Sequence, residues 1–238
     1  MAEGTGPSSP EGDTFATTPR IRTYHARRGR LSRAQHSALS RLSDRWSLEP
    51  AGPQISPAEV FGRRAPLVVD IGCGMGESTI AQASADSGTD VIALDVHTRG
   101  IATILRSLES SGLDNVRVVH GDAVVFLEQR IGQQSLSGAR IYFPDPWPKT
   151  RHSKRRLVQP GFVRLVTSRL VPGGFVHCAT DDMTYAEQMH EVLRADPELT
   201  LHEEVPAEAR RPTTKFERRA QRLGHPVVDL WAARTLSP

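Results

Sequence analysis

The chain of 238 residues contains 38% hydrophobic residues and has a formal net charge of +3. This length suits one α/β domain with additional polar segments. No apolar run is long enough to span a bilayer, and the N-terminus lacks the basic and then apolar pattern of a secretory signal. We therefore expect a cytoplasmic protein without a membrane segment. Two cysteines, Cys73 and Cys178, are too few for a disulfide framework or for a metal site of their own, so no bound metal is expected.

Basic residues are concentrated in separate stretches of the chain, and their positions are more informative than the net charge. One stretch covers residues 20–45, one covers residues 149–156, and one covers residues 210–222. Guanidinium groups match phosphate oxygens and stack on bases, which favours nucleic acid over a membrane as the partner. A solvated basic linker remains an equal alternative for the first stretch.

The N-terminal quarter of the chain is expected to lie outside the main domain. Residues 1–19 are rich in Gly, Ser, Pro and Thr without an apolar period, which predicts a disordered tail. Residues 20–57 form an Arg-rich arm, in which the spacing of Ala38 and Leu42 indicates a short amphipathic helix. Residues 58–238 are then the predicted main domain.

The main domain opens with a strand that runs into a glycine-rich turn. The apolar residues 67–71 are followed by Gly72 and Gly74, which permit a tight turn and close approach of a ligand to the backbone. Glu77 stands where the dinucleotide fingerprint has its last glycine, which disfavours a nicotinamide oxidoreductase. The spacing, with Asp70 before it, resembles the first motif of class I S-adenosylmethionine-dependent methyltransferases.

Two further acids follow the next two predicted strands. Asp95 ends the strand at residues 90–94, and Asp122 follows the strand at residues 116–120. An acid about 20 residues past the glycines is placed to bind a ribose 2′-hydroxyl. Asp122 sits where an adenine amino group would be met. Each acid could instead cap the helix that follows it, and Asp122 could do both.

Strands and helices alternate through most of the domain, which is typical of a parallel α/β sheet. The predicted strands are residues 67–71, 90–94, 116–120, 140–143, 175–179, 199–205 and 227–231. The predicted helices are residues 78–84, 99–110, 123–130 and 161–170, and one after Asp182. We predict a Rossmann-like α/β fold: a mostly parallel seven-stranded sheet with helices on both faces and a C-terminal antiparallel hairpin. The acids would then lie at the carboxyl ends of neighbouring strands, where such sheets bind ligands.

The stretch after the fourth strand of this series has the most informative pattern. Three prolines stop the strand and hold Asp145 and Trp147 on a rigid loop, and a run of cations follows from Lys149 onward. A carboxylate and an aromatic ring beside a cationic strip suit a base bound in a pocket with its phosphates outside. The alternative is a proline-rich turn followed by a solvated basic face.

Together these segments resemble the bacterial tRNA (guanine-N7-)-methyltransferase family over about residues 20–231. The most specific matches are Phe143-Pro144-Asp145-Pro146-Trp147-Pro148-Lys149 and Thr214-Lys215-Phe216-Glu217. Asp70 and Asp95 stand where the family commonly has Glu, and Asp182 stands where it commonly has Trp. The shorter carboxylates would reach about one methylene less far.

The resemblance implies roles for individual residues. Asp145 would lie at the active site. The residues implied to contact S-adenosyl-L-methionine are Asp70, Gly72, Gly74, Asp95, Asp122 and Asp145. Those implied to contact the substrate are Lys149, Asp181, Thr214, Lys215, Phe216 and Glu217. Those implied to face the RNA are Arg151, His152, Ser153, Lys154, Arg155 and Arg156.

The implied activity is transfer of a methyl group from S-adenosylmethionine to N7 of guanine in tRNA, at guanine 46 of the variable loop. tRNA is the implied partner, and we expect a monomer or homodimer without an obligatory protein partner. Two other classes stay open. One is a class I methyltransferase acting on another RNA base or on an amino group. The other is an RNA-binding module without catalysis, which the acids at the strand ends disfavour.

Overall fold

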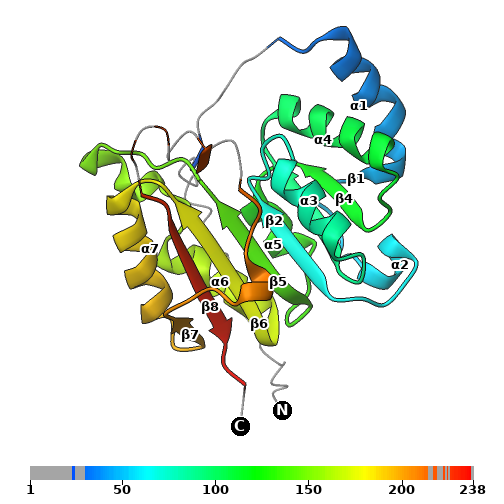
Figure 1. Ribbon diagram of the computed structural model, residues 1–238. Helices are drawn as coiled ribbons and strands as arrows, with labels where there is room; N and C mark the ends of the chain where they lie inside the picture. The colour runs from blue at the N-terminus through cyan, green and yellow to red at the C-terminus, as the bar shows by residue number, and fades with distance from the viewer. Residues whose placement is uncertain are drawn as a thin grey trace, which may run out of the picture.

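The computed structural model describes residues 23–24, 30–213, 217–218, 222, 224 and 226–236. Its described strands form one sheet with the order β1-β4-β3-β2-β5-β6-β8-β7 (Figure 1). The strands are β1 (Ser47–Leu48), β2 (Leu67–Ile71), β3 (Asp90–Asp95), β4 (Val116–His120), β5 (Leu136–Tyr142), β6 (Leu170–Thr180), β7 (Leu199–His202) and β8 (Val228–Arg234).

The strand directions confirm the predicted Rossmann-like fold. The strands from β1 to β6 pair in parallel, whereas β8 runs antiparallel between β6 and β7. The seven strands expected from the sequence are all present, and the two-residue strand β1 is an addition at the edge beside β4.

Helices cover both faces of this sheet. They are α1 (Arg33–Trp46), α2 (Pro57–Phe61), α3 (Glu77–Ala85), α4 (Thr98–Ser111), α5 (Ala123–Gln129), α6 (Pro160–Arg169) and α7 (Met183–Ala195), with short 3-10 turns η1 (Thr150–Arg155) and η2 (Ala207–Ala209). Alternate residues of a strand point to opposite faces, so the apolar strands contribute side chains to two separate core clusters.

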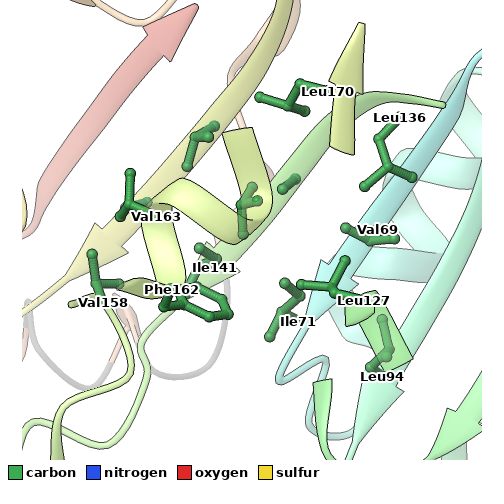
Figure 2. Close-up of a cluster of buried hydrophobic side chains, with 14 of the residues drawn as sticks. Val69, Ile71, Leu94, Leu127, Leu136, Ile141, Val158, Phe162, Val163 and Leu170 are labelled. Atoms are coloured by element: carbon green, nitrogen blue, oxygen red, sulfur yellow. The ribbon is translucent and has the colours of Figure 1, made fainter. Parts of the chain in front are cut away.

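The larger cluster lies between the sheet and helices α5, α6 and α7. Figure 2 shows Leu127 and Phe162 from the helices beside Ile71 and Ile141 from the strands. The smaller cluster lies on the other face, between β3, β4 and helices α1, α3 and α4. The strands are therefore buried on both faces, which explains why they read as continuous apolar runs.

Helix α1 lies along α4 on one side of the sheet (Figure 1). A capping box between Ser32 and Gln35 starts the helix, and Ala38, Leu42 and Trp46 bury its inner face. We expected these residues to belong to an arm outside the main domain. In the structure, residues 33–48 pack on α4 and add β1 to the sheet.

Two arginines of the first basic stretch pair with acids of the fold. Arg41 lies 2.9 Å from Glu109, and Arg45 lies 2.8 Å from Asp114. Exposed pairs of this kind contribute little to stability and leave the side chains in water.

Strand β6 begins earlier than expected. Pro172, Gly173 and Gly174 were predicted to form a turn before the strand, but they lie within it. Opposite β5, Leu136 pairs with Leu170 and Gly138 pairs with Phe175, so β6 has a bulge there. The glycines therefore accommodate a bulge instead of a reversal of the chain. Within the described residues, no helix is long and apolar enough to cross a membrane.

Candidate active site

A cavity of about 180 Å³ opens at the carboxyl ends of the central parallel strands. Its lining includes Gly72, Gly74, Asp95, Asp122 and Asp145, which lie at or just after the ends of β2, β3, β4 and β5. The order of strands reverses between β2 and β5, and open α/β sheets bind ligands at such a point. The structure therefore brings these five predicted site residues together.

The glycine-rich turn forms one wall of the cavity. Gly72 and Gly74 have φ angles of 76° and 58°, in the left-handed region that favours glycine. The N–H of Gly72 donates to Leu94 O at 2.8 Å, and the N–H of Gly74 donates to Asp95 Oδ2 at 2.8 Å. The end of β3 thus fixes the conformation of the turn.

Close packing of α4 supports the same turn from behind. A Cβ atom on Gly100 would lie 2.2 Å from the carbonyl oxygen of Gly74, and one on Gly76 would lie 2.6 Å from the Ile104 side chain. Gly100 was not identified from the sequence. A single glycine at the start of a helix carries no local signal that a backbone passes so close.

Asp95 and Asp122 each make a protein contact and also line the cavity. Asp95 Oδ1 accepts the N–H of His97 at 2.7 Å and lies 2.9 Å from His97 Nδ1. Asp122 caps α5 by accepting the N–H of Val124 at 2.8 Å. Asp122 therefore both caps α5 and lines the cavity, as the sequence allowed.

Asp70 differs from the other acids because it does not line the cavity. Its carboxylate is 2% exposed and accepts a hydrogen bond from the Thr79 hydroxyl of α3. Burial raises the pKa of the Asp70 carboxyl above its ordinary value. In this structure, Asp70 ties β2 to α3 beneath the turn, where direct contact with a ligand had been expected.

The loop that carries Asp145 bends sharply after β5. Phe143 and Trp147 have φ angles of 51° and 46°, which bulky residues rarely adopt. The N–H of Phe143 donates to Ala179 O at 2.8 Å. The buried Trp147 ring donates from Nε1 to Thr23 O at 3.0 Å, so Thr23 lies beside this loop.

Arg156 corrects the expectation that the whole basic run faces RNA. It is 6% exposed and lies beneath the Asp145 loop. Its guanidinium donates to Pro146 O at 2.8 Å, to Thr184 Oγ1 at 2.7 Å and to Gln188 Oε1 at 2.9 Å. Every one of these partners belongs to the protein, so Arg156 ties the loop to α7.

The other members of that run lie at the surface or partly buried. Lys149, Arg151 and Lys154 are exposed. Arg155 Cζ lies 5.0 Å from the centroid of the Trp147 ring, and the His152 ring meets the same tryptophan edge-on. Ser153 accepts the N–H of Arg156 at 3.0 Å and thereby shapes η1.

The structure describes only some of the predicted substrate-binding residues. Thr214, Lys215 and Phe216 lie outside the described residues. Glu217 accepts a hydrogen bond from Arg211 at 2.5 Å. Asp181 is partly buried just past β6, and the neighbouring Asp182 caps α7 by accepting the N–H of Tyr185 at 2.9 Å.

Sequence reasoning missed several residues at the cavity. Thr23, Tyr24 and Tyr142 contribute to its lining. Arg211 was grouped with the C-terminal basic stretch, yet its guanidinium lies over the ring of Phe143. Nothing local distinguishes a buried arginine from its exposed neighbour Arg210.

Comparison with known proteins gives a consistent result. A family model described as "Putative methyltransferase" matches residues 64–230. The chain is 44% identical over 230 residues to the tRNA (guanine-N(7)-)-methyltransferase of Streptomyces avermitilis, covering 94% of this chain and 79% of that protein. It is 47% identical over 232 residues to the protein of the same name from Paraburkholderia xenovorans, covering 94% and 88%.

Solved structures with similar folds have much lower sequence identity. The 16S rRNA methyltransferase KamB matches with a TM-score of 0.53 and 16% identity, over 76% of this chain and 92% of that chain. The antibiotic-resistance methyltransferase Kmr matches with a TM-score of 0.53 and 13% identity, over 81% and 99%. At such identities these matches show the fold alone. The identity to the curated relatives shows more: this chain belongs to the tRNA (guanine-N(7)-)-methyltransferase family.

Proposed function

We propose that this protein transfers a methyl group from S-adenosyl-L-methionine to N7 of a guanine in tRNA, at guanine 46 of the variable loop. The observation that carries this proposal is the position of Asp145. It lines the same cavity as the glycine turn and the two strand-end acids. The relatives of 44% and 47% identity carry the name of this activity.

The cavity has the features that S-adenosylmethionine requires. The turn at Gly72 and Gly74 has no side chain, so a ligand can touch the backbone. Asp95 and Asp122 supply carboxylate oxygens for hydroxyl and amino groups, while Leu94 and Ala123 supply apolar surface. When bound, S-adenosylmethionine supplies a methyl group activated by the positive charge on its sulfur.

Methylation at N7 requires correct placement of the base more than it requires proton transfer. Guanine N7 has a free lone pair and no proton, so no general base has to act first. The task of the protein is to hold the base in line at near-attack distance. The methylated base is cationic, and a carboxylate beside it stabilises that charge more than the neutral ground state. Asp145 is the residue we assign to this role, and Asp181 is the second candidate.

The basic surface beside the site suits a polyanion. The major groove of paired RNA is too deep and narrow to read, so the target base must be unpaired or flipped out. The exposed Arg151 and Lys154 lie on η1, directly after the Asp145 loop. Phosphate contacts of this kind make tRNA binding weaken steeply with salt.

The decisive experiment is incubation with an unmodified tRNA transcript and isotope-labelled cofactor, followed by nucleoside analysis. The proposal expects labelled 7-methylguanosine. A carboxylate followed by Pro146 and Trp147 could also serve an amino group, which is the second candidate function. A label on an exocyclic nitrogen would favour that candidate, and no label in the RNA would reject methylation of this tRNA at either kind of nitrogen.

We also propose the cellular setting and the oligomeric state of the enzyme. The enzyme would act in the cytoplasm, where tRNA is matured, as a monomer or homodimer without an obligatory protein partner. Size-exclusion chromatography coupled to light scattering, with and without tRNA, checks the oligomeric part of this proposal.

A further inference from the structure

Arg211 is a buried cation outside the machinery described so far. Its side chain is 4% exposed. Nε and Nη2 donate to the two carboxylate oxygens of Asp229, at 2.7 and 2.9 Å. Nη1 donates to Glu217 Oε2 at 2.5 Å. Burial lowers the pKa of Arg211, but hydrogen bonds and charges from these acids outweigh it, so the pKa is raised.

The network continues from Asp229 to the cavity. Asp229 Oδ1 lies 2.9 Å from His177 Nε2, and His177 Nδ1 lies 2.9 Å from the Tyr142 hydroxyl. These side chains stand on the adjacent strands β8, β6 and β5. Tyr142 lines the cavity. A continuous series of polar contacts therefore joins Glu217 to the end of β5.

Arg211 also contacts the start of the Asp145 loop directly. Residues 206–213 belong to the connection from β7 to β8 and cross the face of the sheet toward β5 (Figure 1). This path places Arg211 Cζ 5.1 Å from the centroid of the Phe143 ring and 5.7 Å from that of Tyr142. A cation over an aromatic face is attracted by the ring.

Phe143 is the residue that most needs such support. Its φ angle of 51° is unfavourable for a bulky side chain, and such a conformation persists only where surrounding contacts impose it. Phe143 is two residues before Asp145, so its conformation sets the direction in which the carboxylate enters the cavity.

Stability alone is a weak reason for this arrangement. Buried ion pairs can often be replaced by apolar residues of similar volume without loss of stability. An apolar residue at position 211 could cover the two rings. It could not also hold Glu217 and Asp229 in fixed positions, and lysine lacks the fork that engages both carboxylate oxygens of Asp229.

We infer that Arg211 is a positioning residue, which holds Phe143 in its strained conformation and fixes Glu217 relative to Asp145. The inference rests on the proposed function, because it assigns Arg211 to the geometry of guanine methylation. Arg211 touches neither donor nor base in this account and acts through Phe143 and Glu217.

The test compares Arg211→Lys with Arg194→Gln, since Arg194 is an exposed arginine near the end of α7, outside the three basic stretches. Single-turnover methylation is measured at saturating tRNA and S-adenosylmethionine, at a temperature where circular dichroism shows folded protein. Misplacement of reacting groups by about 1 Å costs up to about 10²-fold, so we expect Arg211→Lys to lower the rate by about that factor. We expect Arg194→Gln to retain the rate at saturation within about twofold.

A second pair of variants separates positioning from folding. Asp229→Asn keeps the size of the side chain and weakens the bidentate pair with Arg211. We expect it to lower the single-turnover rate similarly, so it can replace Arg211→Lys if that variant does not fold. The double variant should lose about as much rate as either single variant, since residues of one network are not additive. The cofactor Kd, from calorimetry, should change much less than the rate.

The failure of this inference differs from the failure of the proposed function. Wild-type protein that forms no 7-methylguanosine would reject the proposed function, whatever the variants do. Wild-type activity together with a parental rate in folded Arg211→Lys or Asp229→Asn would reject the positioning role. So would rate losses that add in the double variant.

Discussion

The two halves of the cavity are built in different ways. On the donor side, the turn at Gly72 and Gly74 is held by hydrogen bonds to the end of the neighbouring strand, at Leu94 and Asp95. On the Asp145 side, one backbone bond from Phe143 to Ala179 is supplemented by side-chain bonds to distant parts of the chain. Trp147 donates to Thr23, Arg156 reaches α7, and Arg211 reaches β8.

This difference has a physical cause. A backbone turn of left-handed glycines needs only one neighbouring strand to complete its hydrogen bonds. A loop with bulky residues at positive φ is strained by an order of 1–3 kcal/mol for each such residue, and distant contacts must offset that strain. The first half should therefore be sensitive to added volume, and the second to loss of single polar groups.

The largest effect is expected for Asp145→Ala, on the side-chain-built half. Loss of a group that stabilises developing charge lowers kcat by about 10²–10³-fold. Asp145→Asn keeps the size and tests the charge by itself. Cofactor and tRNA affinities, measured by calorimetry and filter binding, should stay close to wild type. Methylation near the parental rate with normal binding would remove Asp145 from its assigned role.

The next largest effect is expected for Arg156→Gln. Its hydrogen bonds to Pro146, Thr184 and Gln188 would be lost, and a charged hydrogen bond contributes about 1.5–3 kcal/mol. The free energy of unfolding, from urea titration, should fall by about 2–3 kcal/mol. The salt dependence of tRNA binding should not change.

Lys154→Gln is the matched control, because Lys154 is exposed in the same run. Its stability should stay parental, and the slope of log K against log salt should fall by about 1 if the side chain contacts a phosphate. If Arg156→Gln instead alters the salt slope and leaves stability unchanged, Arg156 faces the RNA, as first expected from the sequence.

On the donor side, the corresponding test is Gly76→Ala. Its φ of 79° and a Cβ that would lie 2.6 Å from Ile104 combine backbone strain with overpacking. We expect a loss of about 2–4 kcal/mol in unfolding free energy, since overpacking costs about 1–3 kcal/mol on top of the backbone term. Gly112→Ala is the control, with a φ of 68° and no atom within 4 Å of the added Cβ. Equal losses in both variants would show that close packing on the turn does not matter.

The smallest effect concerns the pH dependence of stability through Asp229. Burial raises the pKa of this carboxyl, but hydrogen bonds from His177 and Arg211 outweigh burial and hold the pKa below its ordinary value. The stability from this group is present above the unfolded pKa of about 3.9, and it is lost as pH falls through the lower folded value. Between pH 4 and pH 2, wild type should therefore lose more stability than Asp229→Asn. Parallel curves for the two proteins would contradict the assigned shift.

Several elements could be read from the sequence because their signals are local. The run Leu67–Ile71, the strand Val116–His120 and the capping pattern at Asp122 match the structure closely. Strand β1 was missed because two residues, Ser47 and Leu48, have no periodicity to detect. The bulge at Gly173 was mistaken for a turn because both use glycine in the same way.

The residues of the candidate site also differ in whether local sequence signals could place them. Spacing alone placed Gly72, Gly74, Asp95, Asp122 and Asp145 at neighbouring strand ends, and the structure brings these residues to one cavity. Asp70 was expected there too, but only the fold could decide that its side chain turns toward α3. Within a strand, the direction of a side chain depends on which face is covered.

The amino-acid sequence by itself determined the order of strands and helices, the glycine turn and the acids at the strand ends, because apolar periodicity and glycine conformation act over a few residues. Only the tertiary structure decided which cations are exposed. Arg156 and Lys154 stand in one basic run, and Arg211 and Arg210 are adjacent, yet in each pair the side chain of one member is buried. Their partners Thr184 and Asp229 are 28 and 18 residues away. Burial of a charge depends on such distant partners, and no local pattern encodes them.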